Sequence, residues 1–107
     1  MLNSGDVVLT KVQFTDTFEI KTRPALVLFE DRGNIIVCGI TSNKNMEGIH
    51  LSKKDGAIKE SVIKINYIFT ISNSFIHKKL FSLSSQKKKE VFESFIRKLS
   101  PLNNSNP

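Results

Sequence analysis

Two apolar segments separated by a short turn constrain the fold of this chain more than any other feature. Residues 24–30 (PALVLFE) are apolar at almost every position, as in a central strand that is covered on both faces. Proline is tolerated in such a strand only as its first residue, so we expect the strand to begin at Pro24. Residues 31–34 (DRGN) have the composition of a hairpin turn, and residues 35–41 (IIVCGIT) form the returning strand. The pattern predicts an antiparallel hairpin at the centre of a sheet.

Three further segments are typical of strands. Residues 5–14 (GDVVLTKVQF) are rich in β-branched side chains, and residues 49–52 (IHLS) resemble a short edge strand. Residues 62–71 (VIKINYIFTI) alternate, which places Lys64, Asn66 and Thr70 on the face away from the core. The opposite, core-facing set is Ile63, Ile65, Tyr67, Phe69 and Ile71.

The period changes to that of a helix near the C-terminus. The apolar positions there have the spacing of an amphipathic helix, and Ser84 or Ser85 is the expected N-cap. They are Val91, Phe92, Phe95, Ile96 and Leu99. We expect a shorter helix through residues 72–80 (SNSFIHKKL) and a disordered tail over residues 100–107. Five short strands and a C-terminal helix predict one mostly β domain, residues 1–99, built as a strongly bent antiparallel sheet or open barrel with the helix packed on it.

The charge balance favours polyanionic partners. The 107 residues include 16 Lys and Arg against 10 Asp and Glu, a net charge of +6. This excess suits nucleic acid, an anionic membrane face or an acidic protein, and charge alone does not choose among them. A single cysteine, Cys38, excludes a disulfide within the chain, and we see no secretory signal and no apolar run long enough to span a membrane. We therefore expect a cytoplasmic protein without a membrane partner.

No pattern of metal or cofactor chemistry is present in the sequence. His50 and His77 lie far apart and have no partner at ligand spacing, so each is expected to be a surface residue. We expect no metal and no cofactor. What remains are three segments that begin or end predicted strands: residues 21–28 (KTRPALVL), 39–43 (GITSN) and 56–72 (GAIKESVIKINYIFTIS).

In order and spacing, these segments resemble the MazF/PemK toxins of type II toxin–antitoxin systems. The resemblance rests on GDVVL, RPALV, ITS and S-V-x-K-x5-T-I-S, and it covers residues 5–99. It implies an SH3-like bent sheet with a C-terminal helix, a homodimer, and metal-independent, sequence-selective cleavage of single-stranded RNA. It also implies a cognate antitoxin protein, whose binding segment we expect to be acidic because the toxin is basic.

The resemblance assigns catalytic positions to Arg23 and Thr41, and Glu19 is the nearest match to a glutamate of the first loop. A guanidinium with parallel donors suits the charge that builds on a phosphate during attack by a ribose 2′-hydroxyl. Relatives often carry a base and an acid where this chain has Lys64 and Asn66. Because an amide does not transfer protons at neutral pH, the general acid or base stays open among Glu19, Asp16 and a purely electrostatic reaction. The expected RNA-binding residues are Thr22, Ser42, Asn43, Lys44, Lys64 and Asn66.

Two other functions compete with RNA cleavage. Gyrase poisons of the CcdB type share the fold and bind a protein target, and an RNA-binding module that has lost cleavage is the other possibility. The pairing of RPALV with ITS favours cleavage over a gyrase target, whereas Asn66 favours the non-cleaving module. Arg23 alone would be a plain solvated residue or a strand cap, and only Thr41 and the family pattern favour the catalytic role.

Overall fold

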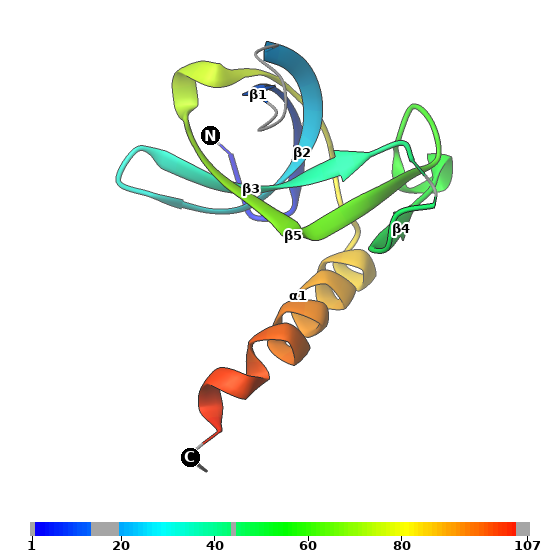
Figure 1. The fold of residues 1–107 in the computed structure, drawn as a ribbon. Coiled ribbons are helices and arrows are strands. Elements are labelled where there is room, and N and C mark those ends of the chain that lie inside the picture. Colours follow the sequence, from blue (N-terminus) through cyan, green and yellow to red (C-terminus); the bar gives the residue numbers. More distant parts are fainter. Residues whose placement is uncertain (1, 14–19, 44, 105–107) are drawn as a thin grey trace.

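Six antiparallel strands and one long helix make up the fold. The computed structural model describes residues 2–13, 20–43 and 45–104. The sheet has the strand order β4-β5-β3-β2-β1-β6 and curls strongly on itself (Figure 1). The elements are β1 (Asp6–Gln13), β2 (Ile20–Asp31), β3 (Asn34–Thr41), β4 (Ile49–Leu51), β5 (Ser61–Ser72), β6 (Ile76–Ser82) and α1 (Ser85–Leu99). The expected mostly β architecture, a bent sheet with a C-terminal helix, is confirmed.

The expected helix at residues 72–80 is wrong, and the sheet has six strands rather than five. A single 3-10 turn, Asn73–Phe75, is followed by β6, which pairs with β1. The Ser72 hydroxyl accepts the Ser74 N–H, which caps this one turn. The other edge of β1 is already paired with β2, so β6 covers the edge that would otherwise stay open. Tertiary pairing therefore decides the structure of this segment.

Pro24 lies inside β2 rather than at its start, which corrects the sequence prediction. β2 begins at Ile20, so residues 20–23 belong to the strand as well. β2 pairs with β1 from Ile20 onward, but with β3 only from Ala25. At Pro24 the strand thus has a paired neighbour on one side only, and such a position tolerates the missing N–H.

The central strands are apolar on both faces because the sheet has a core on each side. One core lies inside the curl, and its buried members are Val8, Ala25, Val27, Ile35, Val37 and Ile71. The other core lies toward α1 and contains Val7, Leu26, Cys38, Ile40, Ile49, Leu51, Ile63, Leu83 and Val91. Alternate residues of β2 contribute to opposite cores, which explains the uninterrupted apolar run that the sequence shows.

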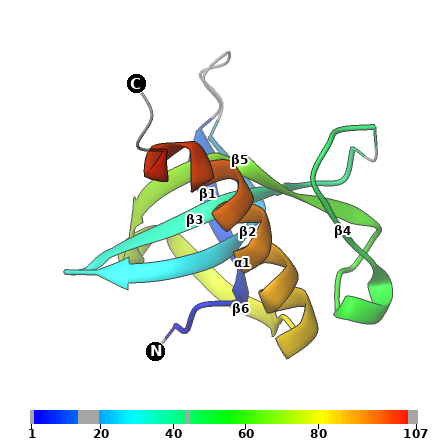
Figure 2. The same cartoon turned by 90° about the horizontal axis from the view of Figure 1, so that it is seen from below.

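Helix α1 packs on the sheet through Val91 and Phe95. Ser84 is the N-cap, and its hydroxyl accepts the Lys87 N–H at 3.1 Å. Of the five expected apolar positions, Val91 is buried and Phe95 is half-buried. The other three are mostly exposed: Phe92 by 65%, Ile96 by 52% and Leu99 by 54%. Figure 1 shows α1 running down and away from the sheet, and Figure 2, seen from below, shows α1 crossing in front of the strands.

An open apolar groove of about 470 Å³ separates α1 from the β2–β3 hairpin. Its lining includes Leu28, Phe29, Ile68, Phe92, Phe95 and Leu99. Beyond α1 the chain continues into a 3-10 turn, Ser100–Asn103, inside the segment that we expected to be disordered. Among the described residues, no helix is long and apolar enough to cross a membrane.

Candidate active site

Arg23 and Thr41 project from the same face of the sheet, where β2 and β3 separate. Ala25 of β2 lies opposite Gly39 of β3. Two residues further along each strand stand Arg23 and Thr41. Because side chains alternate along a strand, both point to the face that Ala25 and Gly39 share. The structure thus brings together the two residues that the resemblance pairs.

Arg23 is held next to a buried part of β1. Its partner across the β1–β2 ladder is Thr10, which is fully buried. The Thr10 hydroxyl donates to the Phe75 carbonyl oxygen at 3.0 Å and so ties this end of β1 to the turn before β6. The Arg23 side chain is exposed, and the proline that follows it fixes the backbone at the next position. An exposed guanidinium therefore stands on a fixed section of strand.

The Thr41 hydroxyl has one of its hydrogen-bonding positions in use. Its oxygen accepts the backbone N–H of Asn43 at 3.1 Å, and the Asn43 side-chain oxygen accepts the N–H of Asn45 at 3.1 Å. At the start of the loop of residues 42–48, the Thr41 and Asn43 side chains thus each accept the backbone N–H two residues further on. The Thr41 oxygen acts as acceptor here, which leaves its hydrogen for donation to another group.

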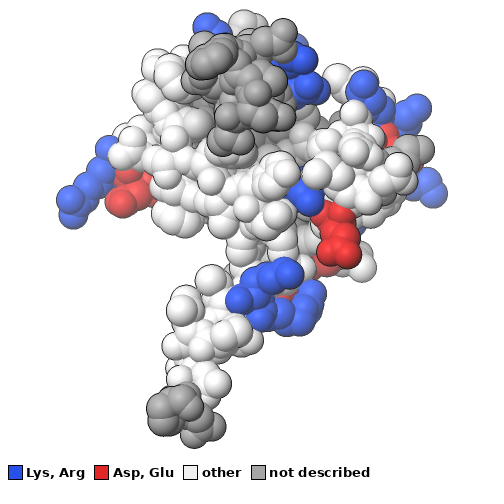
Figure 3. All heavy atoms as spheres, in the orientation of Figure 1, with Lys and Arg blue, Asp and Glu red and all other residues white. Residues whose placement is uncertain are grey.

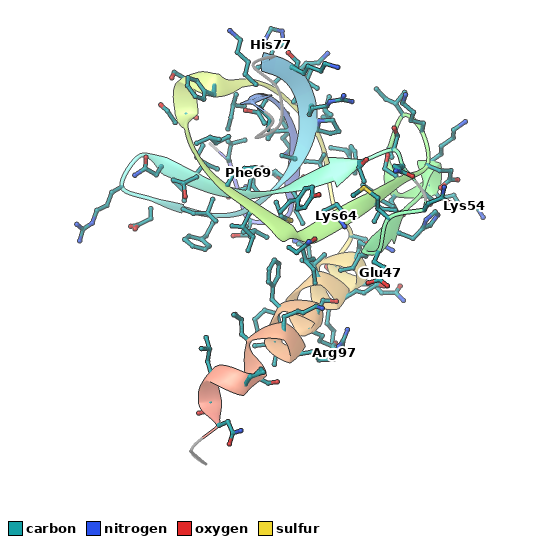
Figure 4. The ribbon with its side chains drawn as sticks, in the orientation of Figure 1. Glu47, Lys54, Lys64, Phe69, His77 and Arg97 are labelled. Atoms are coloured by element: carbon teal, nitrogen blue, oxygen red, sulfur yellow. The ribbon has the colours of Figure 1, made fainter. Side chains whose placement is uncertain are left out.

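Lys64 does not point into an open cleft, which corrects the expectation from strand alternation. Its side chain is only 7% exposed, and its ammonium donates to the Glu47 carbonyl oxygen at 3.0 Å. The ammonium also lies 5.1 Å from the centre of the Tyr67 ring. Figure 4 shows Lys64 on β5, with Glu47 on the loop beside it. Lys64 thus anchors the loop of residues 42–48 to the sheet.

A bulge in β5 explains why alternation fails at this point. Cys38 lies opposite Ile68, but the next residue, Gly39, lies opposite Lys64, so residues 65–67 have no partner on β3. Tyr67, expected in the core, is 43% exposed, and Asn66 is exposed. Alternation breaks only at Ile68, an apolar residue at a polar position directly after the bulge, and sequence reasoning missed this signal.

The other candidate residues are placed as follows. Thr22, Ser42 and Asn43 are exposed, Thr22 next to Arg23 and the other two directly after Thr41. Glu19 and Lys44 lie outside the described residues, as does Asp16.

The two histidines lie on different strands, β4 and β6. His50 of β4 pairs with Glu60 at 3.0 Å, and His77 is exposed on β6. Among residues 2–13, 20–43 and 45–104, no three His, Cys, Asp or Glu side chains are grouped as metal ligands. The basic side chains are spread over several places: Figure 3 shows separate groups at the upper rim, the hairpin tip, the β4 region and α1, divided by neutral surface.

A family model described as "PemK-like, MazF-like toxin of type II toxin-antitoxin system" matches residues 3–99, nearly the whole chain. The chain belongs to this family. The match includes every segment that carried the resemblance, from the first strand to the end of α1. Arg23 and Thr41 therefore lie within a MazF-like toxin domain. No curated protein matches the sequence significantly.

Solved MazF structures share the fold. The MazE–MazF complex from Deinococcus radiodurans (Form-II) superposes with a TM-score of 0.74 at 19% identity and covers 92% of this chain and 96% of that one. Mycobacterium tuberculosis toxin MazF-mt6 gives 0.72 at 17% identity, covering 86% and 93%. A mycobacterial endoribonuclease in complex with its cognate antitoxin gives 0.65 at 10% identity, covering 97% and 95%. At these identities the superpositions establish the MazF-like fold alone.

Proposed function

We propose that this MazF-like toxin is a metal-independent, sequence-selective endoribonuclease that cleaves single-stranded RNA. The observation that carries the proposal is the placement of Arg23 and Thr41 on one face, at the point where β2 and β3 separate. Family membership supports the activity, and the exposed guanidinium supports phosphate binding. The proposed substrate contacts also include Thr22, Ser42 and Asn43, which surround these two residues, and Lys44.

The proposed reaction is an attack of the ribose 2′-oxygen on the adjacent phosphorus. The bond from phosphorus to the 5′-oxygen breaks, which gives a 2′,3′-cyclic phosphate and a 5′-hydroxyl. Negative charge grows on the non-bridging oxygens, and the Arg23 guanidinium offers two parallel N–H donors to them. The Thr41 O–H, whose oxygen already accepts from Asn43, donates to the same oxygens. We assign removal of the 2′-hydroxyl proton to Glu19 and leave protonation of the departing 5′-oxygen to solvent.

Cleavage of a long RNA in EDTA tests this proposal, with mapping of both product ends. We expect cyclic phosphate and 5′-hydroxyl ends at a limited set of sites. A requirement for Mg²⁺, or products with 5′-phosphates, would refute the mechanism.

Arg23→Ala is the matching variant, and we expect it to lower the cleavage rate by about 10²–10³-fold, or about 3–4 kcal/mol. Its control is Arg32→Ala, because Arg32 is an equally exposed arginine at the distant tip of the β2–β3 hairpin. Arg32→Ala should cleave like the parent protein. A folded Arg23→Ala protein with parental activity would mean that the site lies elsewhere.

One observation favours a second candidate, an RNA-binding module without cleavage. Asn66 is exposed in the bulge of β5, two residues after Lys64. Its amide does not act as a general acid or base at neutral pH. The same experiment decides: saturable binding of RNA without any product in EDTA or in Mg²⁺ would favour this candidate.

We further propose that the toxin is a homodimer that forms over the apolar groove. Phe92, Ile96 and Leu99 are mostly exposed on α1, and Phe29 and Ile68 are mostly exposed on the facing side of the groove. A second copy related by a two-fold axis would bring each exposed helix face against the groove of the other chain. Burying these side chains would cover apolar surface that is otherwise exposed to water.

The expected partner in the cell is a small antitoxin with an acidic segment. Two of the superposed structures are described as complexes of a toxin with MazE or with a cognate antitoxin. The net charge of +6 favours an acidic segment that places a carboxylate on Arg23 and excludes RNA. We expect the association rate of the toxin with the product of a neighbouring small gene to fall steeply with salt, measured by stopped-flow. A tight complex that still cuts RNA at the free rate would contradict occlusion of Arg23.

A further inference from the structure

The bulge in β5 turns an aromatic side chain onto the face that carries the candidate active site. Residues 65–67 have no partner on β3, and bulges of this kind redirect side chains and are frequent beside active sites. Tyr67 is the last residue of the bulge and is 43% exposed.

Tyr67 lies against Gly39 of β3. A Cβ atom on Gly39 would stand 3.6 Å from the Tyr67 Cβ and 3.5 Å from the Phe69 ring, so the two aromatic residues close over a position without a side chain. Gly39 shares its face with Arg23 and Thr41. Tyr67 therefore borders the place where the scissile phosphate is proposed to bind.

Lys64 holds the tyrosine ring in place. Its ammonium lies 5.1 Å from the ring centre and is fixed by the Glu47 carbonyl oxygen at 3.0 Å. A cation over a ring face is attracted by the ring quadrupole. The Tyr67 side chain therefore loses its rotamer freedom already in the free protein, and ligand binding does not bear this entropy cost again. An exposed aromatic ring that is already fixed is well suited to stack on another flat group.

We propose that Tyr67 is the stacking platform for one nucleobase of the single-stranded RNA, next to the phosphate bound by Arg23 and Thr41. The inference rests on the proposed function, because it assumes RNA on this face. Single-stranded nucleic acids are commonly bound by a cation on the phosphate and an aromatic ring under the base. Tyr67 thus contributes affinity and positions one nucleotide, while Arg23 and Thr41 act on the phosphate.

The composition of the chain provides a direct probe of this contact. Tyr67 is the only tyrosine, and the chain has no tryptophan, so tyrosine fluorescence reports on this ring alone. The ligand is an RNA oligonucleotide that contains the mapped cleavage site and carries 2′-O-methyl groups, which prevent cleavage. We expect saturable quenching of the fluorescence. We also expect quenching to disappear when one particular base beside the scissile phosphate is replaced by an abasic sugar.

The variants separate the ring from the hydroxyl. Tyr67→Phe keeps the ring and should bind the 2′-O-methyl RNA within about threefold of the parent protein, whereas Tyr67→Leu should weaken binding by about tenfold or more. Leu102→Ala is the control, because Leu102 is also an exposed apolar residue but lies in the 3-10 turn after α1. With cleavable RNA, Tyr67→Leu should raise KM more than it lowers kcat.

Each failure has a distinct pattern. If the protein cleaves RNA but Tyr67→Leu binds the oligonucleotide like the parent, or no abasic position removes the quenching, stacking is wrong and the endoribonuclease stands. If a random 2′-O-methyl RNA pool quenches Tyr67 but no RNA is cleaved, stacking stands and cleavage is wrong. If neither binding nor cleavage occurs, both are overturned. Should Tyr67→Leu not fold, the abasic series and Tyr67→Phe still decide.

Discussion

At the scale of single residues, Cys38 is the clearest case of an environment that sets a chemical property. The side chain is fully buried in β3, and burial raises the pKa of its thiol to about 12. We expect almost no reaction of the native protein with a thiol reagent at pH 8, and complete reaction after unfolding in guanidinium chloride. Equal labelling rates for native and unfolded protein would contradict the buried placement.

The same thiol makes a prediction for alkaline stability. An unfolded cysteine ionises near pH 8.5, while the folded thiol keeps its proton up to a higher pH. The unfolded state therefore binds fewer protons above about pH 8.5, and the free energy of unfolding should fall as the pH rises. The measurement is chemical denaturation between pH 7.5 and 10, as rough limits, with Cys38→Ala as the control that removes this part of the slope.

Arg23 and Thr41 could be predicted from the sequence because each lies at the border between an apolar strand and a polar segment. Arg23 stands before the apolar part of one strand and Thr41 ends the apolar part of the next. In an antiparallel hairpin these two positions lie at the same end of the sheet. The environment of Lys64 could not be predicted. It depends on a bulge three residues long, whose one trace in the sequence is the apolar Ile68 at a polar position, and on the Glu47 carbonyl, which leaves no trace in the apolar–polar pattern.

At the scale of elements, Asp6 joins the start of β1 to β6. It is 2% exposed and accepts hydrogen bonds from the Asn3 N–H at 2.8 Å and the Ser82 hydroxyl at 2.8 Å. The Lys79 ammonium lies 3.4 Å from the same carboxylate. Burial alone would raise the pKa of Asp6, but these hydrogen bonds and the charge of Lys79 outweigh it and lower the pKa.

Asp6→Ala should lower the free energy of unfolding by about 2–3 kcal/mol, because it removes a charged acceptor that receives two hydrogen bonds, from Asn3 and Ser82. Urea denaturation measures this, with Asp31→Ala as control, since Asp31 is exposed at the hairpin turn. The stabilisation by Asp6 is present above the ordinary pKa near 4 and is lost as the pH falls through the lowered folded pKa. The stability difference between parent and variant should therefore shrink on acidification, and a difference that grows would contradict this role.

The central hairpin could be predicted and β6 could not, because the paired residues are close in sequence in the first case and far apart in the second. Residues 24–41 meet through a four-residue turn, so their pairing is local and visible in the sequence. β6 forms because it pairs with the open edge of β1, which lies far earlier in the chain: Asp6 is opposite Ser82. A short polar segment such as residues 72–80 carries no local signal that outweighs such a distant pairing.

At the scale of the whole molecule, the exposed face of α1 predicts the oligomeric state. Phe92→Asp places a charge in the proposed dimer contact and should convert the dimer to a monomer in light scattering. The control is Lys89→Asp, which makes a charge change at another exposed position of the same helix. A Phe92→Asp protein that remains dimeric would mean that the dimer forms elsewhere, and a monomeric parent protein would refute the dimer itself.

The two-sided core gives β2 a parity rule. Odd-numbered residues from Arg23 to Val27 face the inside of the curl and the candidate site, and even-numbered residues such as Leu26 and Leu28 face α1. Insertion or deletion of one residue after Arg23 would exchange the two sets, so that Arg23 would face the helix instead of the candidate site. Changes of two residues preserve both surfaces. A change of one residue would leave Arg23 on its side of the sheet only if a further β-bulge absorbed it.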